Sequence, residues 1–161
     1  HSKYGDINCN LLKFLLDNTF IKTKPPKSTS RESFNKIFLL KIINKFPKIS
    51  CHDFIRTLVN FTAVLVKENI NNFIEYRKNS QLIISGGGAN HPLLIKDIED
   101  NLKIDSIKIL NDKKLNVDSK ESLLMAVMGY ACYHNIPNNM INVTGAKKTA
   151  VYGEIYEWRY F

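Results

Sequence analysis

Residues 81–94 read Gln-Leu-Ile-Ile-Ser-Gly-Gly-Gly-Ala-Asn-His-Pro-Leu-Leu, and this stretch decides the fold. An apolar run that ends in glycines is typical of a buried strand. Pro92 then occupies a position that suits the first residue of a helix, where its missing N–H needs no partner. The stretch therefore predicts a buried strand over residues 81–85, a glycine turn and a helix.

The residues that follow extend this pattern. Residues 106–110 predict a second strand, and Asp118 with Glu121 three residues later predicts the start of another helix. The predicted apolar face of that helix consists of Leu123, Leu124, Val127, Met128, Ala131 and Cys132. A strand, a glycine turn, a helix and a second strand are typical of an α/β unit with parallel strands. Residues 140–143 and 151–156 predict two short strands about a glycine turn.

Upstream of residue 81 the sequence predicts helices. Apolar spacing indicates a helix over residues 7–18, another over residues 33–45, and a long one from Ser50 to about residue 78. Ser50 followed by Asp53 resembles a capping box. The residues predicted on one face of the long helix are Phe54, Leu58, Phe61, Leu65, Ile70, Phe73 and Ile74. Residues 22–32 are expected to be extended, because two prolines exclude a helix there.

Length and composition bound the protein class. The 161 residues are 44% apolar and 11% aromatic, which suits one folded domain and argues against disorder. The sequence begins with His1 rather than Met, so we expect it to be a piece of a longer protein. Three widely spaced cysteines predict no disulfide framework, and we expect a reducing, cytoplasmic setting.

Charge and hydropathy bear on the partners. The formal net charge is +8, but the basic residues are spread along the chain, so we interpret the charge as a general bias and expect no nucleic-acid partner. No apolar stretch approaches the roughly 20 residues that cross a bilayer, and no membrane partner is expected. The cysteines and histidines show no zinc spacing, so no metal site is predicted in this chain.

The three glycines after the strand favour contact with a phosphate. Backbone N–H groups at a helix N-terminus can approach an anion closely where no Cβ intervenes. The structural alternative is a tight turn that needs a positive φ at one position, and one glycine would satisfy it. The stretch is not a P-loop, because position 91 is His instead of the required Gly. A dinucleotide fingerprint fits only in part, because its third glycine is missing.

Five blocks of the sequence resemble the anhydro-N-acetylmuramic acid kinase family, in the order in which the family has them. Residues 84–94 resemble the segment GGGAxNxxL, and residues 25–34 resemble PPKSTGRExF. Residues 56–63 are similar to TLTxxTA, residues 119–122 to xKEA, and residues 143–146 with Gly153 to VTGA…LG. Ser30 stands where the family has Gly, and Ser122 where it has Ala.

The resemblance implies an α/β fold, a ribonuclease-H-like lobe of the actin, sugar kinase and heat-shock ATPase superfamily. All five blocks belong to the C-terminal half of the family. The resemblance therefore implies that residues 1–161 form a single C-terminal kinase lobe. The N-terminal phosphate loop and the segment with the catalytic aspartate are not among these blocks. The family uses ATP and Mg²⁺ to open the 1,6-anhydro ring of 1,6-anhydro-N-acetylmuramic acid with water and to phosphorylate O6, in peptidoglycan recycling.

The resemblance also implies roles for particular residues. Gly86, Gly87 and Gly88 would place backbone donors near the nucleotide phosphates or ribose, and Asn90 would shape the turn. Glu121 is the candidate contact for a sugar hydroxyl or the attacking water, and a capping interaction in its own helix is an equal alternative. Candidate contacts to a carboxylate or phosphate are Lys27, Ser28 and Arg31, whose alternative is a solvated surface loop.

Two functions follow from these expectations. In the first, the chain is the C-terminal part of an ATP-dependent amino-sugar kinase. It would be inactive alone, because the general base lies outside it and an N-terminal kinase lobe is its partner. In the second, the chain is a non-catalytic nucleotide-binding remnant or regulatory module. A homodimer is a further partner that the resemblance suggests.

Overall fold

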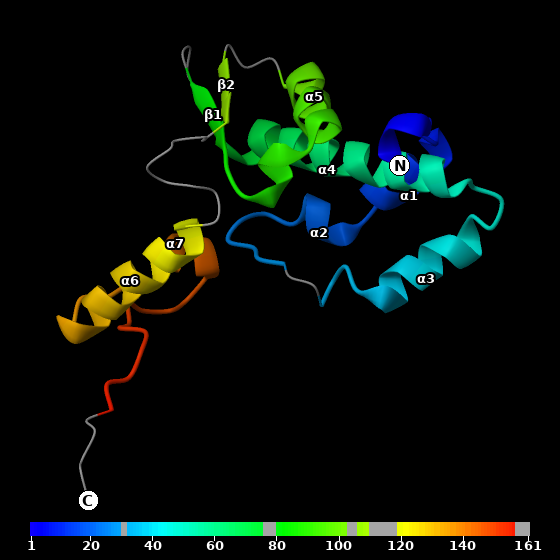
Figure 1. Ribbon diagram of the computed structural model, residues 1–161. Coiled ribbons are helices and arrows are strands. Elements are labelled where there is room, and N and C mark those ends of the chain that lie inside the picture. Colours follow the sequence, from blue (N-terminus) through cyan, green and yellow to red (C-terminus); the bar gives the residue numbers. More distant parts are fainter. Residues whose placement is uncertain (30–31, 76–79, 103–105, 110–118, 157–161) are drawn as a thin grey trace, which may run out of the picture. The chain divides into compact units, whose positions relative to one another are not determined.

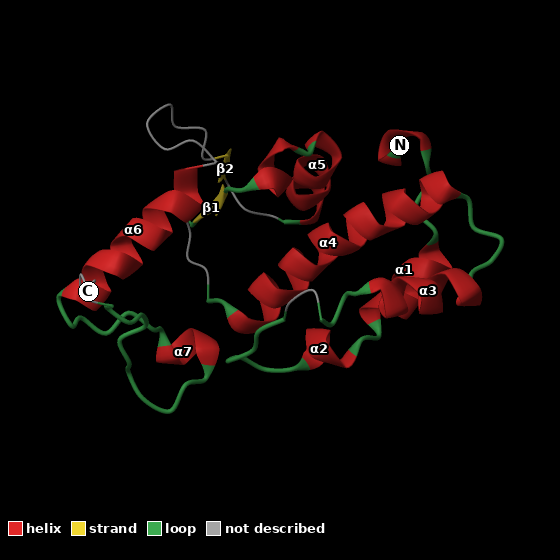
Figure 2. Ribbon diagram, turned by 60° about the horizontal axis from the view of Figure 1, so that its bottom comes forward, coloured by secondary structure: helices red, strands yellow, loops and turns green. Residues whose placement is uncertain are grey.

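The computed structural model describes residues 1–29, 32–75, 80–102, 106–109 and 119–156 (Figure 1). Helices dominate these residues, and the described strands form one two-stranded sheet (Figure 2). In chain order the elements are η1 (Ser2–Tyr4), α1 (Cys9–Leu16), α2 (Thr19–Lys22), α3 (Lys36–Lys45), α4 (Cys51–Phe73), β1 (Gln81–Ile84), η2 (Gly87–Asn90), α5 (Pro92–Asn101), β2 (Ser106–Ile109), α6 (Lys120–Tyr133) and α7 (Ile141–Thr144).

The chain folds into two compact units. The first unit consists of His1–Lys24 and Thr29–Leu110, and the second consists of Pro25–Ser28 and Asn111–Phe161. The first unit holds the sheet, the glycine turn and helices α1 to α5. The second unit holds α6, α7 and a loop that comes from a distant part of the sequence.

The strand, turn, helix and strand predicted around the glycines are confirmed. β1 and β2 pair in parallel, with Leu82 opposite Ile107 and Ile84 opposite Ile109. The expectation of a buried strand is right for one face only: Leu82 and Ile84 pack against the core, whereas Ile83 is 58% exposed. Side chains of a strand point alternately to its two faces, so packing on one face leaves every second residue uncovered.

α4 is the central element of the first unit and contributes to two cores. Leu11, Leu15, Ile21 and Ile42 pack with Phe61 of α4 in the first core, where Leu58 and Leu65 also pack. Ala63 and Ile70 of α4 pack in the second core with Ile98 and Leu102, against Leu82 and Ile84. Successive residues of a helix are about 100° apart, so Phe61 and Ala63 lie on opposite sides of α4. The prediction that Ile70 shares the face of Phe61 is therefore wrong.

The three helices predicted upstream of residue 81 form, but most of their limits differ from the predicted ones. The Ser50 hydroxyl accepts the N–H of Asp53 at 3.0 Å and caps α4, as expected. α4 ends at Phe73 rather than near residue 78, and Ile74 after it is exposed. α1 and α3 are shorter than the predicted ranges and begin after the capping residues Asn8 and Asn35. These short ends are typical, because periodicity locates the middle of a helix and capping decides its limits.

A bidentate ion pair joins α4 to α5. The Nη1 and Nη2 atoms of Arg56 lie 2.6 and 2.8 Å from the two carboxylate oxygens of Asp97. Asn60 donates a third hydrogen bond to Asp97 at 3.1 Å. The Arg56 and Asp97 side chains are only 15% and 6% exposed, so each charge has lost most of its contact with water. The attraction of the partner charge compensates for that loss.

The second unit departs from prediction in α6. The helix forms, but Leu123, Leu124 and Val127 of its predicted apolar face are exposed, and only Ala131 is buried. Cys132 is half-buried, and a Cβ added at Gly153 would come within 2.8 Å of its sulfur. Apolar spacing predicts where a helix forms, whereas burial depends on which elements pack against it.

The two strands predicted for the tail are also wrong. Residues 141–144 form α7, which ends at Gly145 with a left-handed φ of 73°. Residues 151–156 form no regular element and are held by side-chain amides instead. Asn138 accepts the N–H of Tyr152 at 2.6 Å, and Asn139 accepts the N–H of Ala150 at 2.8 Å. Residues 140–143, Met-Ile-Asn-Val, are too short a stretch for periodicity to distinguish a strand from a helix.

We expect Asp97→Ala to lower the free energy of unfolding by about 3–5 kcal/mol, because it leaves the Arg56 guanidinium buried without a partner. Urea unfolding followed by circular dichroism measures the loss. The matched control is Asp100→Ala on the same helix, which breaks the exposed Lys96–Asp100 pair. That control should cost only a small fraction of the loss in Asp97→Ala, because solvent screens the exposed pair. Equal losses in both variants would contradict the role given to the buried pair.

Acid should destabilise the first unit through two carboxylates. Burial raises the pKa of Asp97, but hydrogen bonds from Arg56 and Asn60 outweigh it and hold the pKa below its usual value. The N–H of Asp6, followed by the hydrogen bond with Ser50, lowers the pKa of Asp53. A lowered pKa in the folded state contributes stability above the unfolded value of about 3.9, and that stability is lost as the pH falls through the folded pKa.

The free energy of unfolding should therefore be level near neutral pH and fall below about pH 4. Urea titrations between pH 7 and pH 3 measure this. The Asp97→Asn variant, which starts less stable, should show a shallower fall because one of the two carboxylates is gone. A wild-type stability that rises on acidification would refute the assignment.

Candidate functional site

The glycine turn, residues 86–90, connects β1 to α5, and most of it is open to solvent. Gly86 has a φ of 94° and a ψ of 178°, a conformation that side chains other than that of glycine rarely adopt. The turn continues as the short helix η2, in which Ala89 is buried and Gly87, Gly88 and Asn90 are exposed. The N–H of Ala89 donates to the carbonyl of Gly86 at 2.9 Å and closes the turn.

The fold requires glycine at only one of the three positions. Gly86 needs it for its positive φ, whereas Gly87 and Gly88 are not among the positive-φ glycines. A Cβ added at Gly87 would meet nothing within 4 Å, and one at Gly88 would make an ordinary contact with Leu94 at 3.5 Å. The tight-turn alternative is therefore correct for Gly86 and does not explain the other two glycines.

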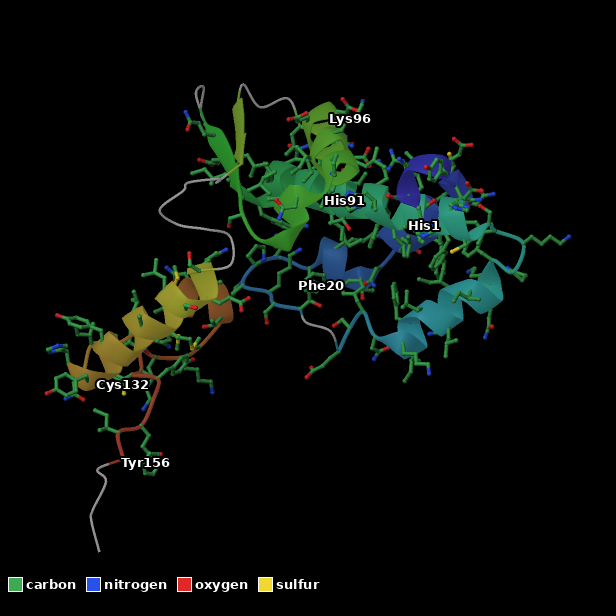
Figure 3. The ribbon with its side chains drawn as sticks, viewed as in Figure 1. His1, Phe20, His91, Lys96, Cys132 and Tyr156 are labelled. Carbon is green, nitrogen blue, oxygen red and sulfur yellow. The ribbon has the colours of Figure 1, made fainter. Side chains whose placement is uncertain are left out.

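His91 joins the turn to α5. Its backbone N–H donates to the carbonyl of Gly88 at 3.1 Å, and its carbonyl accepts the N–H of Ile95 at 3.1 Å. Its side-chain Nδ1 accepts the N–H of Leu94 at 3.2 Å, which places the ring proton on Nε2. Pro92 disfavours the helical conformation at the residue before it, and His91 is extended at the N-cap of α5. Figure 3 labels its side chain.

The sequence analysis assigned no role to His91 and used it only to exclude a P-loop and to weaken the dinucleotide fingerprint. The signal was present in the motif GGGAxNxxL. Counted from Gly86, its asparagine falls at position 91, where this chain has histidine, and Asn90 occupies the preceding variable position. Asparagine is among the strongest N-cap residues, and the structure shows His91 in that capping role.

The second unit brings two of the quoted blocks together. Lys27 is half-buried and Ser28 is exposed in the loop 25–28. A Cβ added at Gly145 would lie 3.5 Å from Cγ of Pro26, so this loop packs beside the turn that follows α7. Arg31 lies outside the described residues, and its predicted contact stays a prediction.

Glu121 lies in the first turn of α6 and is exposed. The capping interpretation involved Asp118, which lies outside the described residues. The structure places Glu121 and the loop 25–28 in the second unit and the glycine turn in the first. The residues predicted to contact the nucleotide thus belong to the first unit, and Lys27, Ser28 and Glu121, predicted to contact the sugar, belong to the second.

The described residues contain no group of three His, Cys, Asp or Glu side chains that could hold a metal ion. Within the same residues, no helix combines the length and apolar character that a membrane span requires. Among the described residues, the candidate binding features are therefore the exposed glycine turn, the loop 25–28 with Lys27, and the exposed carboxylate of Glu121.

Alanine substitutions at Gly86 and Gly87 should show which of these two glycines the fold requires. Gly86→Ala should cost about 1–3 kcal/mol, because it forces a side chain into a strained conformation. Gly87→Ala should change the free energy of unfolding by less than about 0.5 kcal/mol, because its Cβ enters open space. Thermal and urea unfolding of the two variants measure this. A large loss at Gly87 would show that the fold itself needs this glycine.

Comparison with known proteins gives one consistent result. The family model for anhydro-N-acetylmuramic acid kinase matches residues 1–158. A relative from Francisella tularensis subsp. novicida named anhydro-N-acetylmuramic acid kinase is 37% identical over 153 residues, which are 94% of this chain and 40% of the relative. A relative of the same name from Clostridioides difficile is 34% identical over 152 residues, again 94% of this chain and 40% of the relative.

A third relative of that name, from Bacillus cereus, is 32% identical over 157 residues, or 96% of this chain and 41% of the relative. The chain thus spans about two fifths of the length of the curated relatives it matches. The match covers the glycine turn, the loop 25–28 and α6 alike. The chain belongs to the anhydro-N-acetylmuramic acid kinase family.

Proposed function

We propose that this chain supplies the C-terminal part of a kinase that converts 1,6-anhydro-N-acetylmuramic acid to its 6-phosphate. In this reaction water attacks C1 and gives up a proton to the general base while the bond from C1 to the bridging oxygen breaks. That oxygen, O6, receives the γ-phosphoryl group of ATP, and ADP leaves. Family membership and the printed names of the relatives support this substrate. The setting would be peptidoglycan recycling in the cytoplasm.

One observation carries the nucleotide assignment. Gly87 and Gly88 are exposed and are required neither by backbone conformation nor by packing. Glycine there leaves room for something outside the described chain to approach the backbone closely, and a phosphate or ribose suits a turn that leads into a helix N-terminus. Gly86, Gly87 and Gly88 form this wall of the nucleotide site in our proposal, and Asn90 borders it.

The sugar contacts are assigned to the second unit and to Arg31. The cationic ends of Lys27 and Arg31 suit the carboxylate of the muramic acid or a phosphate, and the Ser28 hydroxyl can donate or accept beside them. Glu121 presents an exposed carboxylate that can accept a hydrogen bond from a sugar hydroxyl or from water. Lys27 is held at a loop that packs beside Gly145, which limits its range of positions.

The described residues do not by themselves offer a site for Mg²⁺. No cluster of three ligating side chains lies among them, so we assign no Mg²⁺ ligand to these residues. When bound with ATP, the ion neutralises charge on the phosphate oxygens. We place the general base in the N-terminal kinase lobe, because phosphoryl transfer needs groups positioned from both sides of a cleft.

The fold proposal follows the same division. We propose that residues 1–161 make up a single C-terminal lobe of the ribonuclease-H-like type found in the actin, sugar kinase and heat-shock ATPase superfamily. The parallel pair of β1 and β2 with its glycine turn supports this proposal. The alternative, a non-catalytic nucleotide-binding remnant or regulatory module, has the same turn and differs only in turnover.

The test compares this chain alone with a fusion. The chain alone should give no turnover of ATP with the anhydro sugar. Joined to the part of the Francisella relative that it does not match, it should form the sugar 6-phosphate, which mass spectrometry detects. In that fusion, Gly87→Ala should raise the KM for ATP about tenfold, equivalent to about 1.4 kcal/mol.

Three outcomes would count against the proposal. Turnover by the chain alone would contradict the assignment of the general base to the other lobe. A folded fusion that binds nucleotide without forming product would favour the non-catalytic alternative. An unchanged KM for ATP in Gly87→Ala would remove the glycine turn from the nucleotide site.

A further inference from the structure

The glycine turn has few restraints of its own. Gly87 and Gly88 are exposed, and a Cβ at Gly87 would meet no other atom within 4 Å, so side-chain packing does not hold this part of the backbone. Ala89 is buried and anchors the middle of the turn. A further connection to the first unit runs through His91, whose N–H bonds to the Gly88 carbonyl.

Beyond His91 the structure is well fixed. Leu94 and Ile98 of α5 pack in the second core, and Asp97 is bound by Arg56 and Asn60 of α4. Figure 1 shows α5 lying beside α4, in agreement with these contacts. α5 is therefore held firmly on α4 and the second core. A group that connects the glycine turn to α5 also fixes the position of the turn relative to that core.

We infer that His91 is a positioning residue for the nucleotide: its side chain caps α5 and so fixes the backbone of residues 86–88. The cap consists of Nδ1 accepting the Leu94 N–H at 3.2 Å. Without this cap the Leu94 N–H has no partner in the chain and the first turn of α5 frays. The backbone N–H of His91, which bonds to the Gly88 carbonyl, is then no longer held in place. Small displacements of a binding group cost much affinity, because the contact geometry is narrow.

The chain itself indicates a conservative replacement. The Oδ1 atoms of Asn8 and Asn35 cap α1 and α3 by accepting N–H groups at 3.0 Å. An asparagine at position 91 can make the same kind of bond to Leu94 without an imidazole ring. His91→Asn should therefore rescue what His91→Ala loses, if capping is the role of the side chain.

The matched control removes a cap elsewhere. Ser50 caps α4 with a 3.0 Å bond to the N–H of Asp53, and α4 begins far from the glycine turn in sequence. Ser50→Ala removes one capping bond, as His91→Ala does, and should lower the melting temperature by a similar few degrees. The two variants differ in whether the lost cap adjoins the turn.

Hydrogen exchange on this chain and kinetics on the fusion test the inference, which rests on the proposed nucleotide function. His91→Ala should speed exchange of the Leu94 amide and raise the KM for ATP roughly fivefold, with kcat and the KM for the sugar within about twofold. His91→Asn should restore both exchange protection and KM. Ser50→Ala should leave the Leu94 amide and the KM for ATP as in the wild type.

The outcomes separate this inference from the proposed function. If Gly87→Ala raises the KM for ATP but His91→Ala behaves like Ser50→Ala, the positioning role is overturned and the nucleotide site stands. If His91→Asn fails to restore the KM, capping is not what the side chain contributes, and the inference is also overturned. If Gly87→Ala leaves the KM for ATP unchanged, the nucleotide site itself fails, and the positioning role fails with it.

Discussion

The pair formed by Arg56 and Asp97 is the interaction on which the first unit depends. It joins two helices at a point where both side chains are almost fully covered, and Asn60 satisfies a further position on the carboxylate. A buried pair of this kind adds little net stability, but it strongly disfavours arrangements in which either charge lacks its partner. Its structural consequence is the orientation of α5 on α4, and the glycine turn lies directly before α5.

The three glycines of the turn differ in what the fold requires of them. Gly86 is required by its backbone conformation, whereas Gly87 and Gly88 leave space that the described chain does not fill. Ala89 and His91 then tie this open segment to the core and to the helix. The open glycines are therefore followed directly by anchored residues, which limits the conformational freedom of the turn.

The second unit is organised in a different way. Asparagine side chains at positions 138 and 139 bond to the backbone of residues 148–152 and take the place of a strand partner. α6 forms although apolar residues of its predicted buried face, among them Leu124 and Val127, are exposed. Apolar spacing thus predicted the helix but not its burial. Both features escape pattern reasoning, because an asparagine pair is equally typical of a helix stop and the period carries no information about neighbours.

Helices α1, α3 and α4, the order strand, turn, helix and strand, and the family could all be predicted from the residues alone. They depend on local periodicity, on capping and on short blocks of residues. Only the tertiary structure decided that α4 has a core on each of two sides, that Arg56 meets Asp97, and that the tail forms a helix rather than strands. It also decided that one glycine of three serves the fold and that His91 caps α5. These outcomes depend on contacts between residues far apart in the chain, or on backbone angles, and neither leaves a periodic trace in the sequence.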